Sequence, residues 1–236
     1  MKAVKSFAIK ERYLLINIDD ENVRKQIFSC LSVDKFFKIL FPMTEYKKVN
    51  TLLPTGIANS EIGVFEQKCS KTKISNKKTY TLSFYKNDES ALKSAEQYLN
   101  SEFNDSNIYF KVKYVPPTEL IELFKKKIKK YELTVVAITG PEPLPYFAAF
   151  GLDEVEKSFL PSVAHYKSFT QDMQSENKVI SAKAFENATE LILNSRKVLP
   201  LTQEIRTFYY PKDANILRTQ SMFDFNEYKI KDFNNE

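Results

Sequence analysis

The chain has 236 residues, with 35 lysines and arginines against 30 aspartates and glutamates, and 43% of its residues are hydrophobic. This length and composition are sufficient for one large domain or two small ones, and they exclude a wholly disordered chain. Only four glycines are present, Gly56, Gly63, Gly140 and Gly151, and no two lie within six residues of each other. This spacing excludes a dinucleotide-binding glycine motif, a Walker-A phosphate loop and a G-x-S-x-G nucleophile elbow.

Charge and cysteine content bear on compartment and partners. A formal net charge of +5 permits contact with an acidic surface without requiring it. The two cysteines, Cys30 and Cys69, are more typical of a reducing compartment than of a disulfide framework. The first residues form no apolar run of signal-peptide length, and no stretch approaches the roughly 18 apolar residues that span a bilayer. The sequence therefore predicts a cytoplasmic or nuclear protein without a membrane span.

Hydrophobic periodicity predicts the first elements of the chain. An apolar run over 13–18 is of strand length. Asp19 and Asp20 then offer an N-cap for an amphipathic helix over about 21–32. A second short helix is expected to end before Pro42, because proline is not tolerated in a helix interior.

Strands and a helix are expected to follow. Two strands over 62–71 and 78–86 flank a polar tip, which predicts a hairpin. A helix over about 88–102 and an alternating strand over 107–115 come next. The face of the 78–86 strand that enters the core is expected to carry Tyr80, Leu82 and Phe84.

The order over residues 13–115 is strand, helix, strand, strand, helix, strand, which predicts an antiparallel sheet with two helices on one face. With this order, the segment resembles an RNA-recognition motif (RRM). Lys78–Ala91, Ala95–Phe103 and Ile108–Val112 look like its third strand, second helix and fourth strand. Tyr13–Ile18 is similar to its first-strand hexapeptide. The resemblance implies an α+β, RRM-like fold with four to five antiparallel strands.

The base-stacking residues of the RRM are replaced in this sequence. Lys78 stands at the usual glycine position, Thr79 and Thr81 stand at two aromatic positions, and Leu14 replaces the aromatic of the first strand. Because each stacked base contributes about 1–3 kcal/mol, this face has lost much of its affinity for single-stranded RNA. Leu14 and Ile16 make the face partly apolar, so we expect a protein partner or the C-terminal half to cover it.

Candidate contacts follow from the open sheet face and from a basic loop over 68–78. The lysines of this loop can bind RNA phosphates by charge, or they can guard the edge of a solvated hairpin. The candidate partner or RNA contacts are Leu14, Ile16, Lys68, Lys71, Lys73, Lys77, Lys78, Tyr85, Tyr109, Lys111 and Lys113.

The second half of the chain shows weaker patterns and resembles no recognised family. Three prolines within 141–145 indicate a boundary. Residues 1–140 are interpreted as the RRM-like domain with an extra helix and strand, and 141–236 as a mostly helical C-terminal domain or appendage. The remaining predicted elements are helices over about 118–131, 152–160 and 181–199, and strands over 133–138 and 204–210.

No catalytic constellation is evident. His165 is the single histidine, and no metal cluster or base–nucleophile pair can be built around it, so no catalytic, metal or cofactor residue is predicted. The leading hypothesis is a non-enzymatic adaptor or assembly subunit that binds mainly a protein partner within a ribonucleoprotein or similar complex. Two alternatives remain open: direct RNA binding through the 68–78 loop and the sheet face, and a metal-dependent nuclease around Glu66 and Lys68.

Overall fold

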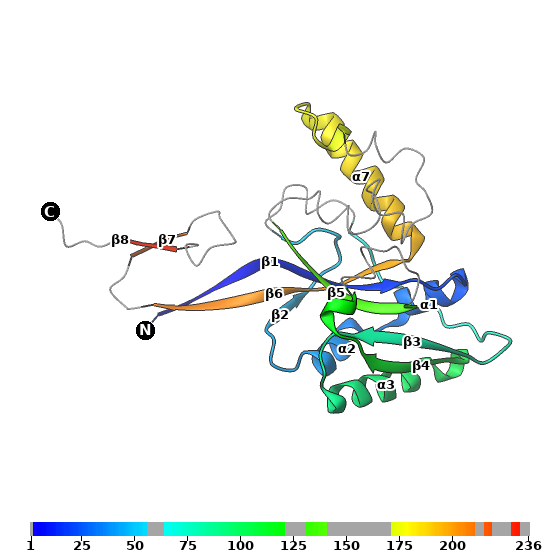
Figure 1. Cartoon of the computed structure of the whole chain (residues 1–236). Coiled ribbons are helices and arrows are strands. Elements are labelled where there is room, and N and C mark those ends of the chain that lie inside the picture. The colour runs from blue at the N-terminus through cyan, green and yellow to red at the C-terminus, as the bar shows by residue number, and fades with distance from the viewer. Residues whose placement is uncertain are drawn as a thin grey trace.

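The structure is a computed structural model, and it describes residues 2–55, 64–120, 131–140, 171–210, 215–218 and 228–231 (Figure 1). A six-stranded sheet with the strand order β2-β6-β1-β5-β3-β4 forms its main layer. The strands are β1 (Lys2–Ile16), β2 (Tyr46–Lys48), β3 (Lys78–Phe84), β4 (Ile108–Tyr114), β5 (Leu133–Thr139) and β6 (Val198–Tyr210). A separate antiparallel pair consists of β7 (Asn215–Arg218) and β8 (Tyr228–Lys231).

The six-stranded sheet is mixed. Strand β3 runs parallel to β4 and β5, whereas β1 runs antiparallel to β5 and β6. The predicted sheet of four to five antiparallel strands is therefore wrong, and so is the mostly helical C-terminal region, because β6 is a long strand next to β1. The physical reason is that a period-two pattern places a strand but does not give its direction or its neighbours.

The helices of the first half are confirmed. They are α1 (Glu21–Cys30), α2 (Val33–Leu40) and α3 (Glu89–Phe103). The Asp20 carboxylate accepts hydrogen bonds from the backbone N–H groups of Asn22 and Val23, and so caps α1 as expected. The Asp88 carboxylate caps α3 in the same way through the N–H of Ala91. Helix α3 is also the crossover that a parallel pair such as β3 and β4 requires.

Helices α2 and α3 cover one face of the sheet. The ring of Phe84 packs edge-on against Phe41 at the end of α2, and Phe110 packs against Phe103 of α3. The predicted core residues of β3 are buried on this side: Tyr80, Leu82 and Phe84 are 8%, 1% and 0% exposed. The expected inward face of this strand is therefore confirmed.

Leu14 and Ile16 lie on the same covered face and not on an open one. Ile16 pairs with Leu133, which in turn pairs with Leu82, and residues that pair across strands share a face. Both side chains are buried. Tyr13 and Leu15, which point to the opposite face, are buried as well. The centre of the sheet is thus covered on both sides, as sheets with parallel strands usually are.

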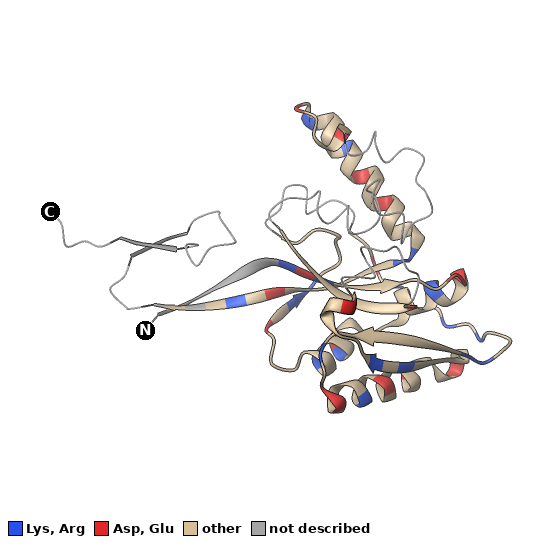
Figure 2. Cartoon of the chain, viewed as in Figure 1, with Lys and Arg blue, Asp and Glu red and all other residues tan. Residues whose placement is uncertain are grey.

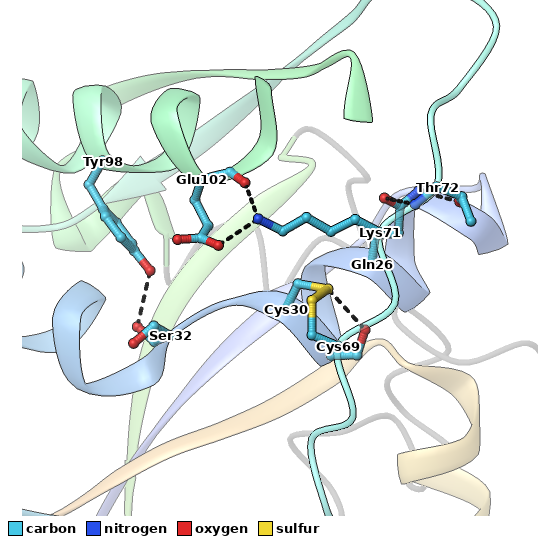
Figure 3. A network of polar contacts seen from close by, with 9 residues as sticks. Gln26, Cys30, Ser32, Cys69, Lys71, Thr72, Tyr98 and Glu102 are labelled. Carbon is cyan, nitrogen blue, oxygen red and sulfur yellow. Dashed lines mark hydrogen bonds and ion pairs between the residues drawn. A yellow bond between two sulfur atoms is a disulfide. The ribbon is translucent and has the colours of Figure 1, made fainter. Parts of the chain in front are cut away.

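Residues 64–77 do not form the first strand of the predicted hairpin. They have no regular secondary structure, and both neighbours of β3 in the sheet are other strands, so β3 has no free edge for a hairpin partner. The segment is instead fastened to α1 by a disulfide between Cys30 and Cys69 (Figure 3). We call residues 64–77 the tethered segment. The expectation of two reduced cysteines is therefore wrong.

Side-chain hydrogen bonds next to the disulfide hold the tethered segment to α3 and to α1. The Lys71 ammonium donates to the carbonyl oxygen of Glu102 at 2.6 Å and to its carboxylate at 2.7 Å. The Gln26 amide group donates to the hydroxyl of Thr72 and accepts from its backbone N–H (Figure 3). These bonds replace the strand ladder that the segment lacks.

The later elements are confirmed in part. Strand β5 is found where it was expected. Helix α7 (Lys178–Ser195) ends four residues before the predicted position, because Arg196 adopts a left-handed conformation with φ of 56° and β6 begins at Val198. Strand β2 was not predicted. The predicted helix over 152–160 and residues 121–130 of the helix over 118–131 lie outside the described residues. The division of the chain near residue 140 stays a prediction.

Loss of the disulfide is expected to destabilise the protein. Cys30 and Cys69 are 39 residues apart, and closing a loop of that length lowers the entropy of the unfolded chain. The double variant Cys30→Ser/Cys69→Ser is expected to lose about 4 kcal/mol of unfolding free energy in urea denaturation. Reduction of the unmodified chain should produce a similar loss and leave the double variant unchanged. Equal stability of the oxidised chain and the double variant would contradict the tether.

The outer edge of β4 is blocked by α3, and this protection can be tested at one residue. The Asn100 side chain donates to the carbonyl oxygen of Phe110 and accepts from its N–H. Asn100→Ala is expected to lower the free energy of unfolding by about 1–2 kcal/mol and to speed hydrogen exchange at the Phe110 amide. The exposed neighbour Gln97 offers the control variant Gln97→Ala, which should change neither. An unchanged exchange rate in Asn100→Ala would refute this edge protection.

Candidate functional site

The carboxyl ends of the three parallel strands point to the region of interest. In open α/β sheets, ligands bind in the crevice outside these ends. Strands β3, β4 and β5 run in the same direction and end at Phe84, Tyr114 and Thr139. Lys86 follows the end of β3, and Lys10 pairs with Thr139 at the end of β5. Two cations therefore lie at this edge from separate parts of the chain.

Charged residues of both signs lie on β1 and β6, which are neighbouring strands of the sheet (Figure 2). The Glu204 carboxylate contacts three cations: Lys10 at 3.3 Å, Arg12 at 3.1 Å and Arg206 at 3.4 Å. We call Lys10, Arg12, Lys86, Glu204 and Arg206 the Arg12 cluster. Burial opposes ionisation of Glu204, but the charges of Lys10 and Arg12 outweigh it and lower the pKa of this carboxyl group.

Aromatic rings form the apolar side of the Arg12 cluster. The guanidinium carbon of Arg12 lies 4.6 Å from the centre of the Phe41 ring and 5.4 Å from that of Phe37. The Lys86 ammonium lies 4.5 Å from the centre of the same Phe41 ring. Burial, and then the charges of Arg12 and Lys10, lower the pKa of Lys86. Two cations thus share one ring, whose negative face offsets part of their repulsion.

Arg12 is the buried centre of this cluster. It is 5% exposed, and its Nη2 donates a hydrogen bond to Glu204. Its Nε and Nη1 are buried and have no hydrogen-bond partner among the described residues. Because buried polar groups are nearly always paired, a guanidinium with two unpaired nitrogens is unusual and needs an explanation.

Glu11 is a second buried ionisable residue, on the opposite face of β1. It is fully buried, and its two carboxylate oxygens have no hydrogen-bond partner among the described residues. Burial raises the pKa of Glu11 well above its usual value, and the nearby Tyr13 hydroxyl only partly opposes this. That hydroxyl donates its proton to the carbonyl oxygen of Leu52 at 2.8 Å. Compared with the unfolded chain, burial in the folded protein therefore shifts Glu11 toward its protonated form.

The tethered segment lines a cavity, and the charges around this cavity are largely paired. A cavity of 470 Å³ lies between α1, the tethered segment and Arg196. Lys25 is paired with Glu21 at 2.8 Å across one turn of α1. Lys68 is paired with Glu66 at 3.4 Å. This cavity accordingly shows less uncompensated charge than the Arg12 cluster.

The lysines of the predicted basic loop lie along the tethered segment and at the start of β3. Lys71 is bonded to Glu102, and Lys78 is paired with Asp20 at 2.8 Å. Lys77 lies 3.9 Å from the centre of the Tyr109 ring. Lys68 and Lys73 are exposed. These side chains are directed into separate local contacts and are not brought together with the Arg12 cluster.

The candidate residues on β4 and after β3 are more scattered. The Tyr109 hydroxyl donates to Asn104, and Lys113 lies 5.2 Å from the centre of the Tyr131 ring. Lys111 is exposed. Tyr85 packs on Phe84 and 6.2 Å from the ring of Phe41, so it alone adjoins the Arg12 cluster. Whether these residues contact a partner stays a prediction.

Sequence reasoning missed the Arg12 cluster altogether. Its central ion pair joins Arg12 and Glu204, which are 192 residues apart. The one local signal was Lys10 and Arg12 at alternate positions directly before the apolar run of β1. Such a pattern is ordinary for a strand that enters a sheet, and it does not identify the acid from β6.

The nuclease alternative is not supported by the site it named. Glu66 and Lys68 are paired with each other, and their side chains are 77% and 86% exposed. They lie on the irregular tethered segment and not on a strand. Within the described ranges, no group of three or more His, Cys, Asp or Glu side chains is placed to hold a metal ion.

Comparisons with known proteins identify the fold. No family model matches the sequence, and no curated protein matches it significantly. Among solved structures, NikA from Brucella suis in complex with Fe(III)-EDTA matches with a TM-score of 0.72 and 13% identity, over 98% of this chain and 53% of NikA. Haemophilus influenzae OppA in complex with the peptide RPPGFSPFR matches with a TM-score of 0.70 and 10% identity, over 96% of this chain and 48% of OppA.

The name of a third match states a cellular location. It is an ABC transporter-associated periplasmic binding protein, DppA from Helicobacter pylori in complex with the peptide STSA. The TM-score is 0.64 and the identity 10%, over 90% of this chain and 45% of DppA. The chain thus spans about half the length of the structures that it resembles.

These matches overturn the expectations based on the RRM. The fold is that of substrate-binding proteins, so the RRM resemblance and the adaptor, ribonucleoprotein, RNA-binding and nuclease hypotheses are wrong. The cytoplasmic or nuclear location is contradicted by the periplasmic setting of DppA, and the Cys30–Cys69 disulfide agrees with an oxidising compartment. DppA is by its name a binding protein, which agrees with the expected non-enzymatic class. No helix in the described part of the chain has the length and apolarity to cross a bilayer.

Glu11 predicts a specific dependence of stability on pH. Because its pKa is raised in the folded state, the folded chain holds this proton at pH values where the unfolded chain releases it. Stability is therefore expected to fall as pH rises above the unfolded value of 4.5. Glu11→Gln should remove this fall. At pH 8, its free energy of unfolding, measured by urea denaturation, should be about 1–3 kcal/mol higher than that of the unmodified chain.

The matched control for this prediction is Glu176→Gln, which changes an exposed glutamate. It should follow the pH profile of the unmodified chain. If the Glu11→Gln profile runs parallel to the other two between pH 4 and pH 8, the carboxyl group of Glu11 is not held in the protonated form.

Proposed function

We propose that the chain is a ligand-binding lobe of a substrate-binding protein that serves an ABC transporter. The observation that carries the proposal is the match of nearly the whole chain, 96–98% of it, to NikA and OppA. A likeness that covers the sheet and its helices together is more specific than a shared supersecondary motif. The periplasmic setting of DppA and the disulfide of this chain support a location outside the cytoplasm.

The ligand class that this fold supports best is a short peptide. OppA and DppA hold peptides, whereas NikA holds a metal chelate. The carboxyl edge of the parallel strands in this chain offers charged groups of both signs with aromatic rings beside them. Such a mixture suits a ligand with charged ends and an apolar body. The protein partner would then be the membrane-embedded part of the transporter.

Binding can be tested on the whole 236-residue chain by ¹H–¹⁵N NMR titration, which detects weak complexes. The probes are the peptides STSA and RPPGFSPFR and, as a control, a ten-nucleotide poly(U) RNA. We expect saturable chemical-shift changes with at least one peptide at peptide concentrations below about 5 mM, because a Kd of about 1 mM still reflects roughly 4 kcal/mol of binding free energy. Saturable shifts with RNA alone, or with none of the probes, would overturn the proposal.

A further inference from the structure

We propose that the Arg12 cluster is a subsite for a carboxylate group of the ligand. The inference rests on the proposed function, because it places the subsite at the carboxyl edge of the parallel strands where the ligand of such a lobe would bind. It adds the chemistry of one part of that ligand. The argument is carried by charge balance, by the unpaired nitrogens of Arg12 and by the exposure of the two lysines.

The cluster holds more positive charge than its own acid can balance. Lys10, Arg12 and Arg206 all contact the one carboxylate of Glu204. Lys86 has no ion-pair partner among the described residues, and it shares the Phe41 ring with Arg12. Three cations thus contact the Glu204 carboxylate, and Lys86 adds a fourth positive charge beside Arg12 that the nearby Asp88 only partly offsets. Burial of Arg12 weakens the screening of its charge by water. A second anion would relieve their mutual repulsion.

Arg12 indicates which kind of anion fits. Its Nη2 already donates to a carboxylate oxygen of Glu204, so the guanidinium is held in a geometry that carboxylates accept. Its Nε and Nη1 remain without a partner among the described residues. Because the Glu204 carboxylate stays next to the site, it repels a doubly charged phosphate more strongly than a singly charged carboxylate.

The outer part of the cluster is open to an incoming group. The Lys10 side chain is 30% exposed, and Lys86 is exposed. Their ammonium groups can receive the carboxylate oxygens at the surface, while Arg12, which is 5% exposed, adds its charge from within. The Phe41 ring supplies an apolar wall for the carbon chain that carries the carboxylate.

The test compares ligands that differ only in this group. Binding of STSA, of its C-terminal amide and of succinate is measured by ¹H–¹⁵N NMR titration of the whole chain. We expect the amide to bind at least about tenfold more weakly than STSA, because it lacks the charge-assisted hydrogen bonds. The exposed lysine allows a variant that leaves the fold intact, Lys86→Gln, which should weaken STSA binding severalfold and reduce the difference between acid and amide.

A matched control separates this effect from a general loss of charge. Lys93→Gln removes an exposed lysine of α3 and should leave both affinities unchanged. The buried centre is tested by Arg12→Gln, with circular dichroism as the check on folding. If this variant does not fold, Lys86→Gln decides the question.

The outcomes distinguish the subsite from the proposed function. Equal binding of STSA and its amide would overturn the carboxylate subsite and leave the peptide-binding lobe in place. Binding of succinate but of neither peptide, lost in Lys86→Gln, would support the subsite for free organic acids and overturn the peptide ligand. Absence of binding by all three probes would overturn both.

Discussion

The structure depends on the position of β1 between β5 and β6. This strand is hydrogen-bonded on both sides, and it connects the start of the described chain to residues 198–210. Its residues Tyr13 to Ile16 are buried on both faces, so they supply the centre of the core. A strand with partners on both edges and cover on both faces has no surface left for recognition. Recognition must therefore take place at the ends of the strands.

The same strand carries two adjacent ionisable residues into the interior. Glu11 lies on one face and Arg12 on the other, and both are at least 95% buried. Burial of ionisable groups without full pairing is costly, and a purely structural role would be better served by apolar residues. Both residues lie where β1 passes the end of β5, at the edge where ligands of open α/β sheets bind. The free-energy cost of burying Glu11 and Arg12 therefore falls at the edge of the sheet where a ligand is expected to bind.

Two local devices compensate for missing strand pairing, one at the outer edge of β4 and one along the tethered segment. The Asn100 side chain takes up the outward N–H and carbonyl of Phe110, and the Glu96 carboxylate accepts from the N–H of Val112, so α3 closes the β4 edge. The tethered segment has no ladder at all, and the Cys30–Cys69 disulfide and the Lys71–Glu102 contact hold it against α1 and α3 instead. Both devices use side chains from helices to satisfy the backbone or to hold irregular chain.

Local sequence was sufficient for most elements and insufficient for their arrangement. The cap at Asp20, the alternation of Tyr80, Leu82 and Phe84, and the helical spacing over 88–102 and 181–199 are short-range signals, and the elements they predicted are present. Direction and neighbours of strands depend instead on contacts between distant residues, so β3 was paired with the wrong segment and β6 was not placed beside β1. For the same reason, Arg12 and Glu204 met only in the tertiary structure. The short-range pattern determined the pieces and their buried faces, whereas long-range packing decided the mixed sheet and the charged cluster at its edge.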